Sequence, residues 1–179
     1  DVASAPSAPV RDDESGPFDL LAARQLIEGE IAATAAGHVS AAGLAGLREA
    51  IARMREHAGD YARCDAADRD FHLRIAQATG NSAFAPIVGG MWDQRRGNLW
   101  TKMEEHFHTP ALHAKTVTDH EAIVAALEAR DPDAARKAMH RHLARVAREF
   151  QRRWDGTRAT GKRGSLPQRI SAPRHPAQP

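Results

Sequence analysis

Apolar residues recur every three or four positions across most of this chain, which is the spacing of a buried helix face. No stretch shows the alternation of β-branched and polar residues that is typical of a strand. Alanine, leucine, glutamate and arginine, all strong helix formers, are abundant between residues 18 and 155. In the first helical stretch the expected inward positions are Leu20, Leu21, Ile27, Ile31 and Ala32. The pattern therefore predicts an all-α fold.

Capping residues divide the periodic region into six or seven helices. Thr109-Pro110 and Asp131-Pro132 each place a capping side chain before a proline in the first turn. Gly80-Asn81 indicates a left-handed helix end followed by a new cap. Short connections between long helices predict an antiparallel bundle. The expected helices span about 18–38, 40–57, 61–79, 82–107, 109–129 and 131–154, the fourth being broken or kinked near Pro86 or Gly89-Gly90.

The two flanks lack this periodicity. Residues 1–17 are rich in proline, alanine and serine and then acidic, which predicts a linker. Residues 156–179 are basic and have few large apolar side chains, so we expect a disordered tail after a domain at 18–155. The single cysteine, Cys64, excludes an internal disulfide framework. No apolar run approaches a membrane span or a secretory signal, so we expect a cytoplasmic protein without membrane contact.

The distribution of charge changes the meaning of the high isoelectric point. The chain has a formal charge of +2 and a pI of about 9.0, which by itself hints at nucleic-acid binding. Residues 151–179, however, hold seven basic side chains and only one acid. The region 18–150 is therefore close to neutral. This count predicts that the basic character belongs to the tail and not to a folded face.

Three of the ten histidines share an unusual placement. His72 follows Asp68 by four residues, so both side chains leave one helical face. His120 lies on a stripe with Ile123, Val124 and Leu127, and His142 lies on a stripe with Met139, Val146 and Phe150. Three separate helices are thus expected to point an imidazole into the core, and one of them adds a carboxylate.

Two interpretations of these residues are open from the pattern alone. A shared divalent metal would satisfy three neutral imidazoles and one carboxylate, and this donor set suits Zn²⁺ best, with Mn²⁺, Ni²⁺ or Fe²⁺ as alternatives. Alternatively, each histidine is an ordinary hydrogen-bonded core residue, and Asp68 and His72 form a surface pair. Such a metal, if five- or six-coordinate, would leave positions open for a small carboxylate.

At these residues the sequence resembles a known family. The stretches FDLLAARQLIEGEIAATAA (18–36), DRDFHLRIAQATGN (68–81) and DHEAIVAALEARDPDAARKAMHRHL (119–143) are similar to the C-terminal effector domain, or FCD domain, of GntR-type transcription regulators in the FadR branch. The resemblance implies an antiparallel bundle that binds small organic acids. Many members hold a metal with an Asp and three His, which here correspond to Asp68, His72, His120 and His142.

The resemblance also implies partners. Arg24 matches an arginine that commonly faces the effector pocket, although its pairing with Glu28 on a helix surface is an alternative. Arg95 and Arg96 on the fourth helical segment are further candidates for binding a carboxylate effector. Family members carry a winged-helix DNA-binding domain ahead of this one, and 1–17 is too short to form it. We therefore expect a homodimeric effector domain that reaches DNA only through a domain outside this chain.

Two other function classes compete with a ligand sensor. A hydrolytic metalloenzyme would use the same metal to activate water, but it needs a general base nearby. Periodicity places no spare acid on the faces of Asp68, His120 or His142, and it directs Glu121 and Glu149 elsewhere, which disfavours an enzyme. The third class is a helical interaction module whose histidines bind no metal.

Overall fold

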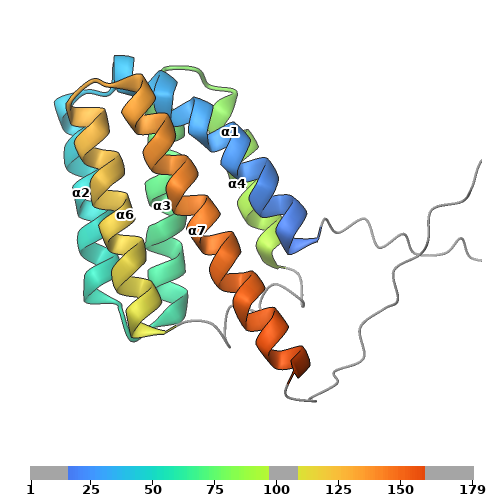
Figure 1. Cartoon of the computed structure of the whole chain (residues 1–179). Coiled ribbons are helices and arrows are strands. Elements are labelled where there is room, and N and C mark those ends of the chain that lie inside the picture. The colour runs from blue at the N-terminus through green and yellow to red at the C-terminus, as the bar shows by residue number, and fades with distance from the viewer. Residues whose placement is uncertain (1–15, 97–108, 160–179) are drawn as a thin grey trace, which may run out of the picture.

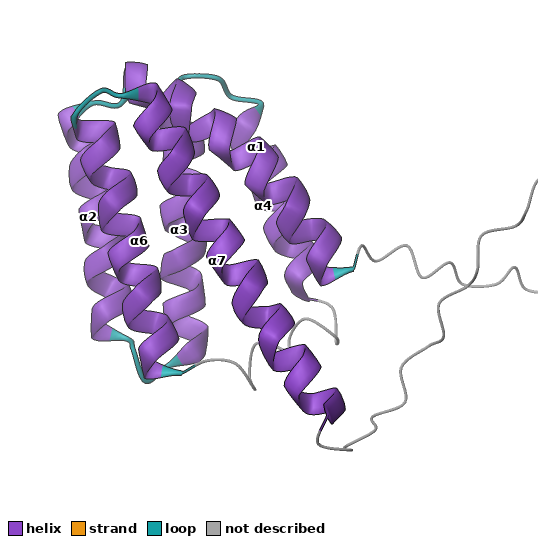
Figure 2. Ribbon diagram, viewed as in Figure 1, coloured by secondary structure: helices purple, strands orange, loops and turns teal. Residues whose placement is uncertain are grey.

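The structure, a computed structural model, describes residues 16–96 and 109–159. Within these residues the chain is helical and contains no strand (Figure 2), which confirms the predicted all-α class. None of the described helices is long and apolar enough to cross a membrane. The elements are α1 (Pro17–His38), α2 (Ala41–Glu56), α3 (Tyr61–Ala78), α4 (Phe84–Asp93), the 3₁₀ turn η1 (Gln94–Arg96), α6 (Pro110–Glu128) and α7 (Pro132–Ala159).

Helices α2, α3 and α6 begin within a residue of their predicted positions, and each has a side-chain cap. The side chains of Ser40, Asp60 and Thr109 accept hydrogen bonds from backbone N–H groups three residues later, at 3.0, 3.1 and 3.3 Å. These bonds satisfy donors that have no partner within the helix. After α3, Gly80 has φ +76°, a left-handed conformation that costs a glycine little. Local chemistry therefore sets the boundaries of α2, α3 and α6.

The six α-helices described form a bundle in which α1 packs along α7, and α3 lies against α1, α2 and α4 (Figure 1). Helix α6 contacts α1, α2 and α7. The side chains in the core between these helices are almost completely buried. Its largest apolar side chains with less than 2% exposure are Leu21, Leu47, Met54, Phe71, Ile75, Ile123, Leu127, Met139 and Leu143. The bundle thus brings α1, α3, α6 and α7 together around one interior.

The buried face of α1 differs from the predicted one. Ile27 is 38% exposed and Leu26 is 68% exposed, whereas Arg24 and Glu28 are buried at 3% and 2%. The expectation that Ile27 points inward was therefore wrong. The helix turns the face of Leu21, Arg24 and Glu28 toward the core because the two charged side chains find partners there, as described below.

Helix α4 and helix α7 also depart from their predicted limits. Helix α4 runs unbroken through Pro86 and Gly89-Gly90, so the predicted break was wrong. Pro86 is the third residue of the helix, where its missing N–H would have had no intrahelical acceptor. Helix α7 continues to Ala159, beyond the predicted domain boundary at 155. The predicted continuation of the fourth helix to 107, the linker before residue 16 and the tail after 159 lie outside the described residues.

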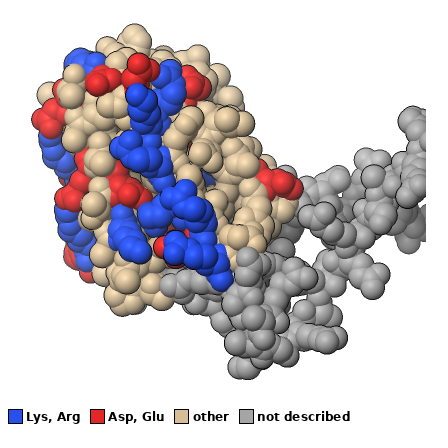
Figure 3. All heavy atoms as spheres, viewed as in Figure 1, with Lys and Arg blue, Asp and Glu red and all other residues tan. Residues whose placement is uncertain are grey.

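Cations gather on one face of the domain. Figure 3 shows a band of Lys and Arg side chains over α7, and the exposed members of that helix include Lys137, Arg141, Arg148 and Arg152. The expectation that no folded face is basic was therefore wrong. The net charge of residues 18–150 is close to zero because acids on the other helices balance the cations of α7, so this count did not reveal the basic face.

Candidate metal centre

Three imidazoles from three helices meet in the interior of the bundle. His72 on α3, His120 on α6 and His142 on α7 are 1%, 0% and 2% exposed. The Nε2 atoms of His120 and His142 are 3.3 Å apart. Each of the three residues offers a ring nitrogen, and these nitrogens all lie within 4.8 Å of one another. Such convergence is what a single ion shared by three helices requires.

Asp68 lies beside this cluster, one helical turn before His72. Its Oδ1 atom is 3.5 Å from Nε2 of His72 and 3.4 Å from Nε2 of His120. Asp68 Oδ1 and His72 Nε2 are buried and have no hydrogen-bond partner among the described residues. Three imidazole nitrogens and one carboxylate oxygen, converging with unpartnered atoms, fit a divalent ion. The structure thus brings together all four residues singled out in the sequence, and their role as ligands stays a prediction.

Two further carboxylates accept hydrogen bonds from the Nδ1 atoms of His72 and His142, on the side of each ring away from the cluster. Glu28 on α1 accepts a hydrogen bond from Nδ1 of His72 through Oε2. Asp119 on α6 accepts one from Nδ1 of His142 at 3.3 Å, and it also accepts one from Nε of Arg145 at 2.6 Å. A carboxylate at Nδ1 fixes the ring and leaves Nε2 to face the centre, as in the outer shell of protein metal sites.

His120 is held differently. Its Nδ1 atom is buried without a hydrogen-bond partner among the described residues. Its ring instead stacks on Phe71, with centroids 4.1 Å apart and planes inclined by 13°. The orientation of this imidazole therefore depends on packing between α6 and α3.

Sequence reasoning missed both supporting carboxylates. The alternative interpretation placed Arg24 and Glu28 as a pair on the helix surface; the pair forms, but it is buried. Periodicity assigned no spare acid to the helix faces of Asp68, His120 or His142, and it missed Glu28, which contacts His72, and Asp119, which contacts His142. The usable signal for Glu28 was its spacing of seven residues from Leu21, which places both on the buried face of α1.

Neighbouring charges keep the carboxylates of Glu28 and Asp68 ionised although both are removed from solvent. Burial alone raises the pKa of Glu28, but Arg24 and His72 outweigh it and lower that pKa to about 2. Burial also raises the pKa of Asp68, and the surrounding imidazoles hold it well below its usual range. Burial lowers the pKa of His120 and of His142. Two of the imidazoles are therefore neutral near pH 7, which is the form that binds metal.

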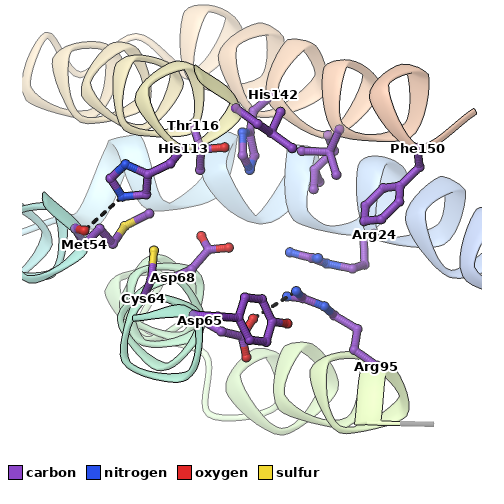
Figure 4. A pocket seen from close by; sticks show the side chains of 14 residues that line it. Arg24, Met54, Cys64, Asp65, Asp68, Arg95, His113, Thr116, His142 and Phe150 are labelled. Carbon is purple, nitrogen blue, oxygen red and sulfur yellow. Dashed lines mark hydrogen bonds and ion pairs between the residues drawn. The ribbon is translucent and has the colours of Figure 1, made fainter. Parts of the chain in front are cut away.

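A cavity of about 100 Å³ opens beside the histidine cluster. Asp68 and His142 form part of its wall, and Arg24 and Arg95 extend toward it from α1 and η1 (Figure 4). The wall also includes Tyr61, Cys64, Thr116 and Phe150. The pocket thus combines the candidate metal centre with two cationic side chains.

Both arginines are ordered by an indole ring and a carboxylate. Their Cζ atoms lie 4.5 Å (Arg24) and 3.8 Å (Arg95) from the ring centroid of Trp92, which is the geometry of a cation–π contact. Arg24 donates from Nε to Glu28 at 2.6 Å, and Arg95 donates from Nη2 to Asp65 at 2.9 Å. Nη2 of Arg24 is buried without a hydrogen-bond partner among the described residues.

Two of the three predicted effector residues lie at this cavity. Arg24 and Arg95 both line the cavity, and their role in binding stays a prediction. The side chain of Arg96 lies outside the described part of the chain, so its role stays a prediction.

Comparison with known proteins identifies the domain. The family model for the FCD domain matches residues 19–145. The chain belongs to the FCD domain family. This FCD domain is 42% identical over 130 residues to the Exu regulon transcriptional regulator of Escherichia coli K12, covering 72% of this chain and 49% of that protein.

Other relatives support the same assignment. The Uxu operon transcriptional regulator of Escherichia coli K12 is 34% identical over 137 residues (75% of this chain, 53% of the relative). A putative L-lactate dehydrogenase operon regulatory protein of the same organism is 31% identical over 143 residues (79% and 54%). The chain therefore spans about half the length of the curated relatives it matches.

Solved structures show the same architecture. Escherichia coli McbR/YncC superposes with a TM-score of 0.67 at 17% identity, covering 76% of this chain and 64% of that one, which establishes a shared fold. A GntR protein of Streptococcus agalactiae superposes with a TM-score of 0.61 at 25% identity, covering 73% and 57%. The predicted FCD domain of a GntR-type regulator is confirmed, and such a domain is regulatory and not an enzyme.

Proposed function

We propose that this FCD domain senses a small carboxylate through a divalent metal held by Asp68, His72, His120 and His142. The observation that carries the proposal is the convergence of three buried imidazoles and Asp68 beside a cavity that two arginines enter. Zn²⁺ is the first candidate, and Mn²⁺, Ni²⁺ and Fe²⁺ have compatible ligand preferences. A bound metal would supply a Lewis-acidic position for a carboxylate oxygen.

Arg24 would bind the same carboxylate. Arg24 is 3% exposed, and its Nη2 has no hydrogen-bond partner among the described residues. A charged donor buried without an acceptor is costly, and an anionic oxygen in the cavity would satisfy it. Trp92 supports the guanidinium plane from one face, which reduces the freedom that Arg24 would lose on binding.

The charges around the cavity favour an effector with one carboxylate. Glu28 pairs with Arg24, and Asp65 pairs with Arg95, so these four charges cancel. A divalent ion with Asp68 as its anionic ligand then leaves one positive charge, which a monocarboxylate neutralises. A relative named for an L-lactate dehydrogenase operon is in keeping with such an effector, because lactate is a small monocarboxylate.

The helices that carry the site connect it to regulation. The candidate ligands come from α3, α6 and α7, so a bound effector that repositions the metal changes how these helices pack. In the whole regulator we propose that this change is transmitted to a DNA-binding domain outside this chain. We also propose a homodimer through the outer face of α1 and α4, where Leu26, Ile27 and Ile87 are 68%, 38% and 45% exposed.

The test is metal content followed by an effector screen. We expect one divalent ion per chain by elemental analysis, and none in His142→Ala. A thermal-shift screen of the metal-loaded chain should then find stabilisation by a monocarboxylate, with smaller effects from di- and tricarboxylates of similar size. A chain that binds no metal after incubation with Zn²⁺, Mn²⁺, Ni²⁺ and Fe²⁺ would favour an interaction module with ordinary core histidines.

A further inference from the structure

We infer that Glu28 is a positioning residue that couples the metal centre to the effector arginine. The inference rests on the proposed function, because it needs both a metal at the histidines and a carboxylate at Arg24. It assigns a role to a helix, α1, that contributes none of the candidate metal ligands.

The coupling follows from how the two oxygens of Glu28 are used. The side chain is 2% exposed, and it lies where α1 packs against α3. Its Oε2 accepts from Nδ1 of His72, and its Oε1 accepts from Nε of Arg24 at 2.6 Å. One rigid carboxylate therefore spans a candidate metal ligand and a candidate effector contact.

Each of these two bonds sets an orientation. Donation from Nδ1 of His72 leaves the Nε2 lone pair free on the side of the ring where Asp68 Oδ1 lies 3.5 Å away, so both atoms could bind one ion. Donation from Nε of Arg24 holds the guanidinium over Trp92 and leaves Nη2 without a partner beside the cavity. A shift of His72 upon metal binding is thus passed to Arg24 through a single side chain.

Asp119 provides a matched comparison within the same chain. It supports a second candidate ligand, His142, through Nδ1 at 3.3 Å, as Glu28 supports His72. Its other partner, however, is Arg145, and the cavity wall contains neither Asp119 nor Arg145. Loss of Asp119 should therefore weaken metal binding without releasing an effector arginine, whereas loss of Glu28 should affect both the metal and Arg24.

The experiment compares Glu28→Gln with Asp119→Asn in the full chain. Glutamine keeps the shape of Glu28 but offers one acceptor and one NH₂ donor, so it can serve His72 or Arg24 and not both. Co²⁺ is the metal probe, because its visible absorption reports ligand geometry, and acetate is the carboxylate probe. Co²⁺ affinity is measured by competition with a chelating dye, and acetate affinity by titration of the Co²⁺-loaded protein.

We expect both variants to lose about 10- to 100-fold in Co²⁺ affinity, which is typical of outer-shell changes. Only Glu28→Gln should also weaken acetate binding to the fully loaded protein, by about tenfold, and shift the Co²⁺ spectrum with acetate present. Unchanged acetate affinity in the Co²⁺-loaded Glu28→Gln protein would overturn the coupling. An equal loss of acetate affinity in Co²⁺-loaded Asp119→Asn would overturn it as well.

Two further outcomes keep the inference separate from the proposed function. If the unaltered chain binds no Co²⁺, the metal site itself fails and the coupling fails with it. If the unaltered chain binds Co²⁺ and acetate while Glu28→Gln matches it in both, only the role of Glu28 is refuted. Should Glu28→Gln not fold, Glu28→Asp keeps the charge but is too short to span both partners, and it should show the same paired losses.

Discussion

Removal of His120 gives a quantitative test of the metal centre. The side chain is fully buried, and its Nε2 lies 3.3 Å from Nε2 of His142 and 3.4 Å from Oδ1 of Asp68. In the unaltered chain, free metal at 100 times its dissociation constant should stabilise the fold by about 2.7 kcal/mol. If His120→Ala weakens binding at least 100-fold, the same metal concentration should add at most about 0.4 kcal/mol.

The assay measures melting with a chelator and again with saturating Zn²⁺ for each protein. At about 4 °C per kcal/mol, metal should raise the midpoint by about 11 °C in the unaltered chain and by about 2 °C in His120→Ala. Taking the difference within each protein removes the packing cost of the substitution, such as the lost stacking on Phe71. A full metal-induced shift in His120→Ala would refute the assignment of this ligand.

His113 supplies the matched control on the same helix. It lies seven residues before His120, is 9% exposed, and hydrogen-bonds through Nε2 to the backbone oxygen of Met54 at 2.8 Å. His113→Ala should lower the melting temperature with chelator, because it removes a buried hydrogen bond. Its metal-induced shift should remain that of the unaltered chain, since His113 is not one of the three clustered histidines.

Three further predictions follow from single side chains. Arg24→Ala should leave one metal per chain but weaken carboxylate binding by about tenfold or more, the value of a charged hydrogen bond, and unchanged affinity by calorimetry would remove Arg24 from the site. Burial, with Asp68 and Asp65 nearby, raises the pKa of Cys64 to about 12, so at pH 8 the thiol is almost entirely protonated. Cys64 should therefore react with Ellman's reagent only after unfolding or as the pH rises toward 12, and rapid reaction of the native chain at pH 8 would contradict this. Leu26→Asp should convert a dimer to a monomer in sedimentation analysis, whereas Thr118→Asp on the exposed face of α6 should not; a Leu26→Asp protein that stays dimeric would place the contact elsewhere.

Local chemistry made most of the fold predictable. The caps at Ser40, Asp60 and Thr109 act over three or four residues, so the sequence itself contains both partners of each bond. The inward direction of the three candidate histidines was predictable for the same reason, because each is surrounded by apolar neighbours at helical spacing. Caps and apolar periodicity therefore specify where a helix begins and which of its faces is buried.

Contacts between helices were not predictable in the same way. Glu28 is buried because Arg24 and His72 neutralise it, and His72 is 44 residues away in the chain. Ile27 appeared to continue the apolar stripe of α1, yet it is 38% exposed, and the buried face of α1 contains Arg24 and Glu28 instead. Asp119 is adjacent to His120 in sequence but supports His142 on the next helix. Such pairs become visible only when the bundle is assembled.

The central claim is that the three clustered histidines bind one metal ion, and X-ray absorption at the zinc edge tests it most directly. The zinc-loaded chain should show three imidazole nitrogens at about 2.0–2.1 Å together with carboxylate oxygen. Addition of a stabilising carboxylate should change the oxygen scattering and leave the three imidazoles in place. A zinc spectrum with fewer than three imidazole ligands would contradict this claim. So would a His120→Ala protein whose zinc spectrum is the same as that of the unaltered chain.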